Sequence, residues 1–124
     1  MPPFSILTHD HPVLHWDFLL DPDGEGLLLT WRILESPDKT HFISGIKQPD
    51  HRRLYLDYTG PISGNRGSVE IWDRGEYELK SGEEIRSDSI RITCQGDRIK
   101  GEIQLKRLVG NDWEYTYFPA SRPA

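Results

Sequence analysis

The chain has 124 residues and a formal net charge of −5, with 28% charged and 35% hydrophobic residues. This length predicts a single domain that buries a core without disulfides or zinc clusters. The negative charge excludes a broad basic surface of the kind that coats nucleic acids, but it leaves room for a local grip on one strand end.

No apolar run approaches the ~20 residues that span a bilayer, and the N-terminus lacks the pattern of a signal peptide. We therefore expect a cytoplasmic protein with no membrane contact. Cys94 is the single cysteine, which excludes an internal disulfide and fits a reducing compartment. Its strand-like setting predicts a small buried residue rather than a catalytic thiol.

Strand signals dominate the first half of the chain. A short apolar run at 4–8 predicts a strand. Apolar runs at 15–20 and 26–34 flank the turn sequence Asp-Pro-Asp-Gly at 21–24, which predicts a β-hairpin. Further strands are expected at 41–46 and 54–58, before a loop at 60–67 that is rich in Gly, Pro, Ser and Asn.

The second half continues in the same way. Strand-like runs at 68–72 and 75–79 flank Asp73-Arg74-Gly75, for which we expect a tight turn with Gly75 at positive φ. Residues 81–87 predict one helical turn. The remaining strands are expected at 89–94, 100–108 and 113–118, with tight turns at 95–97 and 110–112. Regularly spaced strands with Gly-rich turns predict a mainly β barrel or sandwich over residues 1–118, with a flexible tail at 119–124.

Three residues near the N-terminus carry the clearest chemical signal. His15 and Asp17 lie two apart in a predicted strand, so their side chains project from one face, with Leu19 next on that face. His9 ends the preceding strand, and a hairpin would bring it beside His15. Two imidazoles and one carboxylate suit Mn, Fe(II) or Zn. The alternative is a polar strand with incidental histidines.

A second group lies in the locally basic stretch 47–53, Lys-Gln-Pro-Asp-His-Arg-Arg. His51 precedes Tyr55 by four residues, and imidazole and phenol can both donate hydrogen bonds to a phosphate oxygen. The alternatives are a surface histidine in a solvated loop and a half-buried core tyrosine.

Five ordered blocks resemble one family over nearly the whole chain. The first is the His-x5-His-x-Asp pattern from His9 to Asp17, and the second is Trp31 in the following strand. The third runs from Asp50 through His51 and Tyr55 to Ile62. The last two are Val-Glu-Ile-Trp-Asp-Arg-Gly at 69–75 and a Gly-spaced pattern at 92–101. Together they resemble the 3′-phosphoesterase domain of bacterial DNA ligase D.

The resemblance implies a compact β-barrel-like single domain with little helix. It implies a divalent metal, Mn²⁺ as the favoured ion with Zn²⁺ as the alternative, held by His9, His15 and Asp17. It also implies that His51 and Tyr55 contact the scissile phosphate. The implied activity removes a 3′-terminal ribonucleoside or a 3′-phosphate from DNA or RNA–DNA ends. Family context adds a separate DNA ligase or polymerase as a partner.

The sequence also departs from the family. Leu7, Leu19 and Glu35 stand at positions that are polar or basic there. Other cations would then have to hold the phosphate, and we take Arg52 and Arg53 as the substrate-binding candidates, with Arg32, Lys47 and Arg66 as further ones. On the assumption that a lost phosphate contact would be restored, Leu19→Arg would raise activity. The alternatives to a phosphoesterase of nucleic-acid ends are a metal-binding module that binds ends or a repair partner without hydrolysis, and an enzyme for a different phosphoester.

Overall fold

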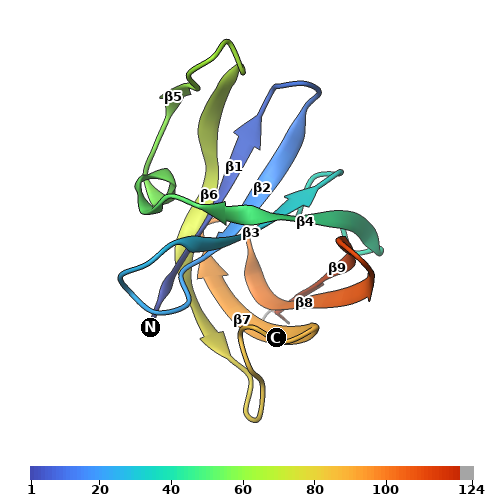
Figure 1. The fold of residues 1–124 in the computed structure, drawn as a ribbon. Coiled ribbons are helices and arrows are strands. Elements are labelled where there is room, and N and C mark those ends of the chain that lie inside the picture. Colours follow the sequence, from blue (N-terminus) through green and yellow to red (C-terminus); the bar gives the residue numbers. More distant parts are fainter. Residues whose placement is uncertain (121–124) are drawn as a thin grey trace.

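The computed structural model describes residues 1–120 and confirms the mainly β prediction. Nine strands account for most of the chain, and the helical structure in this range is one turn of 3₁₀-helix, η1 (Figure 1). The elements are β1 (Pro3–His9), β2 (His15–Leu20), β3 (Leu28–Ile33), β4 (Ile43–His51), η1 (Arg53–Leu56), β5 (Gly60–Pro61), β6 (Ser68–Leu79), β7 (Ser89–Gly96), β8 (Lys100–Val109) and β9 (Asp112–Pro119).

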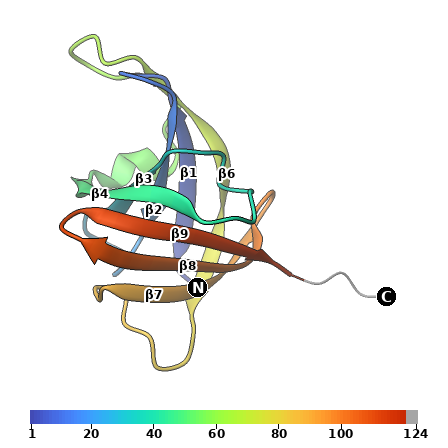
Figure 2. The same ribbon diagram turned by 90° about the vertical axis from the view of Figure 1, so that its right-hand side faces the viewer.

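Eight of these strands close into an antiparallel barrel. The order is β1-β2-β3-β4-β9-β8-β7-β6, and β6 pairs back onto β1 to close the sheet, while the two-residue β5 adds to the other edge of β6. Figure 2 shows β4, β9, β8 and β7 lying side by side, with β1 and β6 running across them. Closure leaves no free edge among the eight strands. No helix within residues 1–120 is long and apolar enough to cross a membrane.

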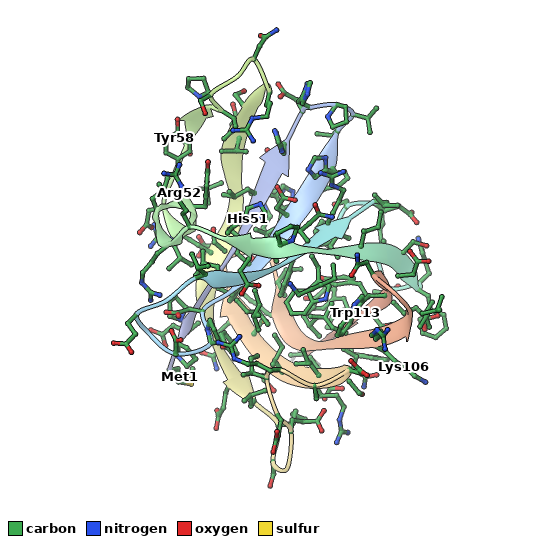
Figure 3. All side chains as sticks on the ribbon, viewed as in Figure 1. Met1, His51, Arg52, Tyr58, Lys106 and Trp113 are labelled. Carbon is green, nitrogen blue, oxygen red and sulfur yellow. The ribbon has the colours of Figure 1, made fainter. Side chains whose placement is uncertain are left out.

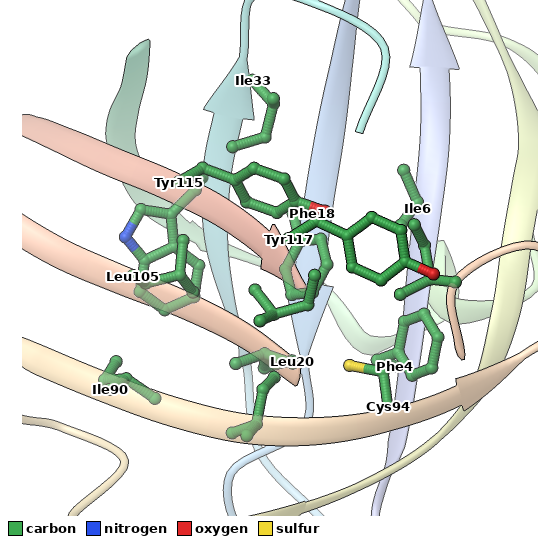
Figure 4. Close-up of a cluster of buried hydrophobic side chains, with 14 of the residues drawn as sticks. Phe4, Ile6, Phe18, Leu20, Ile33, Ile90, Cys94, Leu105, Tyr115 and Tyr117 are labelled. Atoms are coloured by element: carbon green, nitrogen blue, oxygen red, sulfur yellow. The ribbon is translucent and has the colours of Figure 1, made fainter. Parts of the chain in front are cut away.

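Strand alternation fills the inside of the barrel with apolar side chains. Phe18 and Leu20 on β2 project inward with no exposed surface, and Trp31 on β3 meets Trp113 on β9 edge to face, with ring centroids 5.4 Å apart. Cys94 lies in the same core, fully buried as expected (Figure 4). Burial raises the pKa of its thiol far above the ordinary value, which leaves it unreactive at neutral pH.

A second apolar cluster lies on the outer face of β6, β1, β2 and β3. Its buried members are Leu7, Leu19, Leu28 and Val69. Residues 52–67, which we call the cover segment, run over this face and include partly buried side chains packed against the cluster: Tyr55, Leu56, Tyr58 and Ile62. The outer face of these strands is therefore partly covered rather than open to solvent.

The predicted strand at 54–58 is wrong, because Arg53–Leu56 forms the 3₁₀-turn η1. The alternating Leu-Tyr-Leu-Asp-Tyr sequence fits a strand, but no neighbouring strand is available to pair with it. Its aromatic side chains instead pack down onto the outer cluster, so tertiary contacts override local β propensity.

The predicted turn at Asp73–Gly75 is also wrong. Residues 68–79 form one continuous strand, and Gly75 does not have a positive φ. Asp73 is buried and accepts hydrogen bonds from the backbone N–H groups of Asp97, Arg98 and Ile99, so it caps the β7–β8 turn. A Cβ at Gly75 would lie 2.0 Å from the Gln95 carbonyl oxygen, so this glycine is needed for close strand approach.

Some of the remaining local predictions are confirmed and others are wrong. The hairpin over 15–34 and the turns at 95–97 and 110–112 are confirmed by the β2–β3, β7–β8 and β8–β9 pairings. The helical turn at 81–87 is wrong, because that segment contains only non-helical turns. Pro119, which we assigned to the tail, belongs to β9, and residues 121–124 of the predicted tail lie outside the described range.

Candidate metal centre

Backbone pairing brings His9, His15 and Asp17 together on the outer face. His9 and His15 are direct partners in the antiparallel β1–β2 register, and Asp17 follows two residues later on the same face. The connection at 10–14 joins the two strands at this end of the barrel. Figure 1 shows that the β5–β6 connection reaches the same end.

The distances among the three side chains are short. Asp17 Oδ1 lies 3.3 Å from His15 Nε2, and Asp17 Oδ2 lies 3.7 Å from His9 Nδ1. One ligand atom from each residue lies within 4.8 Å of the others. Ligand atoms that share one cation at about 2.1 Å are separated by roughly 3–4 Å, so the spacing fits a single divalent ion.

Hydrogen bonds on the far side of each imidazole set the orientation of the rings. His9 Nε2 lies 2.8 Å from the Arg66 carbonyl oxygen, and His15 Nδ1 lies 2.9 Å from that of Val13. A carbonyl accepts, so each of these nitrogens carries the proton. His9 Nδ1 and His15 Nε2 are then left with lone pairs that face Asp17. Carbonyl partners of this kind hold metal-binding histidines in the correct tautomer.

One of these lone pairs has no hydrogen-bond partner in the described part of the chain, residues 1–120. His15 is 1% exposed, and its Nε2 is buried without a donor or acceptor at hydrogen-bond geometry. Buried polar atoms are seldom left unsatisfied, and a cation between the imidazole and the Asp17 carboxylate would satisfy this one. The donor set therefore fits the metal that the sequence predicts.

The Gly-rich loop at 60–67 supplies the carbonyl that orients His9. Gly64, Asn65 and Gly67 all have positive φ, and this path turns the Arg66 carbonyl toward the imidazole. Asp10 secures the same loop, since it accepts a 2.8 Å hydrogen bond from Ser68 N–H. That bond holds the pKa of the Asp10 carboxyl below its usual value. The sequence did not predict that the carbonyls of Arg66 and Val13 orient the two histidines, because every residue carries a carbonyl. For Arg66, the Gly and Asn residues of the loop were the available signal.

His51 and Tyr55 lie near each other, but no hydrogen bond, ion pair or ring contact within residues 1–120 joins them to the three candidate ligands. The two rings are 5.8 Å apart, and His51 Nδ1 donates to the Pro49 carbonyl at 2.9 Å. His51 pairs with Leu28 and so belongs to the same outer face of the barrel. Arg52 is exposed and its guanidinium lies over Tyr55, 5.9 Å from the ring centroid. Figure 3 shows His51, Arg52 and Tyr58 on one side of the molecule.

Arg53 has a structural partner. Its guanidinium forms a two-point ion pair with the buried carboxylate of Asp21 and also donates to the Gly26 carbonyl at 3.1 Å. The hydrogen bonds from Arg53 hold the pKa of Asp21 below its usual value. These contacts fix η1 to the β2–β3 connection and engage both terminal nitrogens of the guanidinium within the fold.

Leu19 is on the predicted face but is not available to a ligand. It has no exposed surface and lies in the outer cluster with Leu7 and Leu28, against which the tyrosines of the cover segment pack. Leu7 is buried in the same way. Two of the positions where the sequence departs from the family thus form one apolar cluster, so the face is polar around Asp17 and apolar around Leu19.

The molecule is an antiparallel β-barrel with a His-His-Asp site on its outer face. A family model of the DNA ligase D 3′-phosphoesterase domain matches residues 7–107, and the chain belongs to this family. One relative is the multifunctional non-homologous end joining protein LigD of Pseudomonas aeruginosa strain PAO1, 27% identical over 84% of this chain. The chain spans 13% of that protein's length. Family membership supports a function in processing nucleic-acid ends.

Proposed function

We propose that this protein is a metal-dependent phosphoesterase that acts on the 3′ ends of nucleic-acid strands and removes a 3′-ribonucleoside or a 3′-phosphate. The observation that carries the proposal is the buried, unsatisfied His15 Nε2, which faces a carboxylate and a second imidazole with its lone pair free. His9, His15 and Asp17 would hold the ion, with Mn²⁺ preferred and Zn²⁺ as the alternative.

Other side chains of the protein would bind the substrate and hold the proton for the leaving group. When bound, the cation supplies Lewis-acid stabilisation of a phosphoryl oxygen. His51 has its Nδ1–H fixed by Pro49, so its Nε2 is the atom that would hold a proton for the leaving oxygen. The Tyr55 hydroxyl would donate to a phosphate oxygen, and the exposed Arg52 would bind the strand. Because no hydrogen bond, ion pair or ring contact within residues 1–120 joins His51 or Tyr55 to the three ligands, these roles require the substrate to bridge the two groups.

The proposed substrates are DNA or RNA–DNA 3′ ends, because the relative with the longer chain is named for end joining. A separate ligase or polymerase is the partner class we propose, since such proteins consume a 3′-hydroxyl. The setting is a reducing one such as the cytoplasm, where the free Cys94 thiol is stable.

The test combines metal binding with turnover. Calorimetry should show one Mn²⁺ site in the wild type, and His9→Ala, His15→Ala and Asp17→Ala should each weaken it by at least about 10-fold. His41→Ala is the matched control, because His41 is exposed and its Nε2 pairs with Glu35 rather than with any of the three candidate ligands. Turnover is then measured with Mn²⁺ on a primer–template that carries one 3′-ribonucleotide or a 3′-phosphate.

Unchanged Mn²⁺ and Zn²⁺ binding in all three variants would contradict the metal site. Normal metal binding with no turnover on either end would favour the second candidate, a module that binds ends or a repair partner without hydrolysis. The observation that favours this candidate is that His51 has its hydrogen bond with Pro49 and its ring contact with Tyr55, and neither is with a residue of the ligand set.

A further inference from the structure

Arg32 lies beside the candidate metal site and has no carboxylate partner among residues 1–120. It lies on β3 and is the direct cross-strand partner of Asp17 on β2. Cross-strand partners project from the same face of a sheet, so the Arg32 side chain leaves the outer face next to the Asp17 carboxylate. Arg32 is half-buried, and its Nε is buried without a hydrogen-bond partner.

Asp17 does not neutralise this cation, although it is the adjacent residue. Its two oxygens face the imidazoles of His15 and His9, at 3.3 and 3.7 Å, and no ion pair forms with Arg32 within 4 Å. The cross-strand neighbour of Arg32 on its other side is Ile46, on β4. Neither strand that pairs with β3 therefore satisfies the guanidinium.

Other arginines of the described chain are already engaged. Arg53 binds Asp21, Arg74 binds Asp57, and Arg91 binds Glu83. Arg66 donates to Ser63, and the guanidiniums of Arg52 and Arg98 lie over aromatic rings. Within residues 1–120, Arg32 has no ion pair and its Nε has no hydrogen bond, and its cross-strand partner Asp17 belongs to the candidate metal-ligand cluster. A buried N–H without a partner calls for an acceptor, and an oxygen of a bound phosphate would supply one here.

We propose that Arg32 binds the terminal phosphate of the nucleic-acid 3′ end. The planar guanidinium can donate two parallel hydrogen bonds to two oxygens of one phosphate, which a lysine cannot do. This inference rests on the proposed function and adds to it the group that distinguishes a phosphorylated 3′ end from a 3′-hydroxyl end. It assigns the phosphate contact to β3, on the Asp17 side of the outer face, whereas Leu19 is sealed in the apolar cluster.

The test compares two oligonucleotides that differ at the 3′ end. One ends in a 3′-hydroxyl and the other in a 3′-methylenephosphonate, which keeps the charge and is not hydrolysed. Anisotropy at fixed salt and saturating Mn²⁺ should show that the wild type prefers the phosphonate end. Arg32→Gln should reduce that preference by about 10-fold or more, the effect of losing a charged hydrogen bond. Its affinities for the hydroxyl end and for Mn²⁺ should not change.

Two further variants distinguish the effect of two-point hydrogen bonding by the Arg32 guanidinium from the effect of its positive charge. Arg32→Lys keeps the charge without the bidentate fork and should recover only part of the preference. Arg91→Gln removes a positive charge on β7, away from the site, and should leave the preference unchanged.

The outcomes are distinguishable. If Arg32→Gln keeps the wild-type preference, Arg32 does not bind the phosphate, while the proposed function stands. Equal loss of affinity for both ends in Arg32→Gln and Arg32→Lys would assign Arg32 a structural role and overturn the inference. If the wild type binds Mn²⁺ but shows no preference for the phosphonate end, this inference fails, and the turnover assay decides the proposed function separately.

Discussion

Replacing Leu19 tests whether the outer cluster is a true second core. Leu19 has no exposed surface and packs with Leu7, Leu28 and Val69 under Tyr55 and Tyr58. Buried Leu→Ala changes cost about 2.7–5 kcal/mol, and the cost is lower where the surroundings can collapse into the cavity. The cover segment is only partly buried, so we expect about 3 kcal/mol for Leu19→Ala. For a chain of this length that corresponds to a fall in Tm of about 10 °C.

Because Leu19 is buried in the outer cluster, we no longer expect Leu19→Arg to raise activity. A guanidinium at this position would enter an apolar cluster with no acceptor placed for it, so the variant should be less stable than Leu19→Ala. Activity on a 3′-phosphate should fall with the folded fraction rather than rise. The assay is urea unfolding of the wild type and both variants by tryptophan fluorescence, with turnover measured below each transition.

Leu54→Ala is the matched control, because Leu54 lies in η1 with 45% of its surface exposed. It should change stability by less than about 0.5 kcal/mol. A Leu19→Arg variant that is as stable as the wild type and faster in turnover would refute the reasoning, since it would show that the side chain reaches the site without breaking the cluster.

Three other changes test the contacts that hold the fold. Asp73→Asn replaces one carboxylate oxygen with an amide among the N–H groups of Asp97, Arg98 and Ile99, and it should cost at least about 2 kcal/mol in urea unfolding. Gly75→Val should cost more than about 1 kcal/mol, because its Cβ meets the Gln95 carbonyl; a normal Tm would contradict the close approach of β6 and β7. Asp21→Asn should cost about 1.5–3 kcal/mol at pH 7 through loss of the charged bonds from Arg53. Because the pKa of Asp21 is lowered in the folded state, its stabilising effect is present above pH ~4 and is lost as the pH falls through the folded pKa, so wild type and variant should converge in acid.

Sequence patterns predicted the parts of the fold that local chemistry decides. Asp-Pro-Asp-Gly at 21–24 allows few paths other than a reversal, and the β2–β3 pairing follows from it. The sequence patterns gave wrong predictions where contacts between segments distant in the sequence determine the local structure. The sequence at 54–58 has the composition of a strand, and only the position of the outer cluster makes it a cover. Asp73-Arg74-Gly75 has the composition of a turn, and only the approach of β7 explains why Gly and Asp are needed there.

The candidate site shows the same division. Period-2 geometry placed His15 and Asp17 on one face, and the His9–His15 pairing in the β1–β2 register agrees with the expected hairpin. The carbonyls of Val13 and Arg66 could not be predicted, because a backbone acceptor has no sequence signature. Arg32 could be named only as one of several cations, since its pairing with Asp17 depends on the register between β2 and β3.

The cover segment links the outer cluster to the site, which explains how one face can be both apolar and polar. Tyr55 and Tyr58 pack on the cluster at one end of this segment, and the Arg66 carbonyl orients His9 at the other. Detachment of the segment would therefore expose the apolar side chains and also free the His9 ring to rotate. Leu7 and Leu19 oppose that detachment, because they form apolar contacts with the cover segment where it lies on the sheet. On this argument the two leucines help to position His9 from a distance, and the phosphate contact is left to a cation on the neighbouring strand, Arg32.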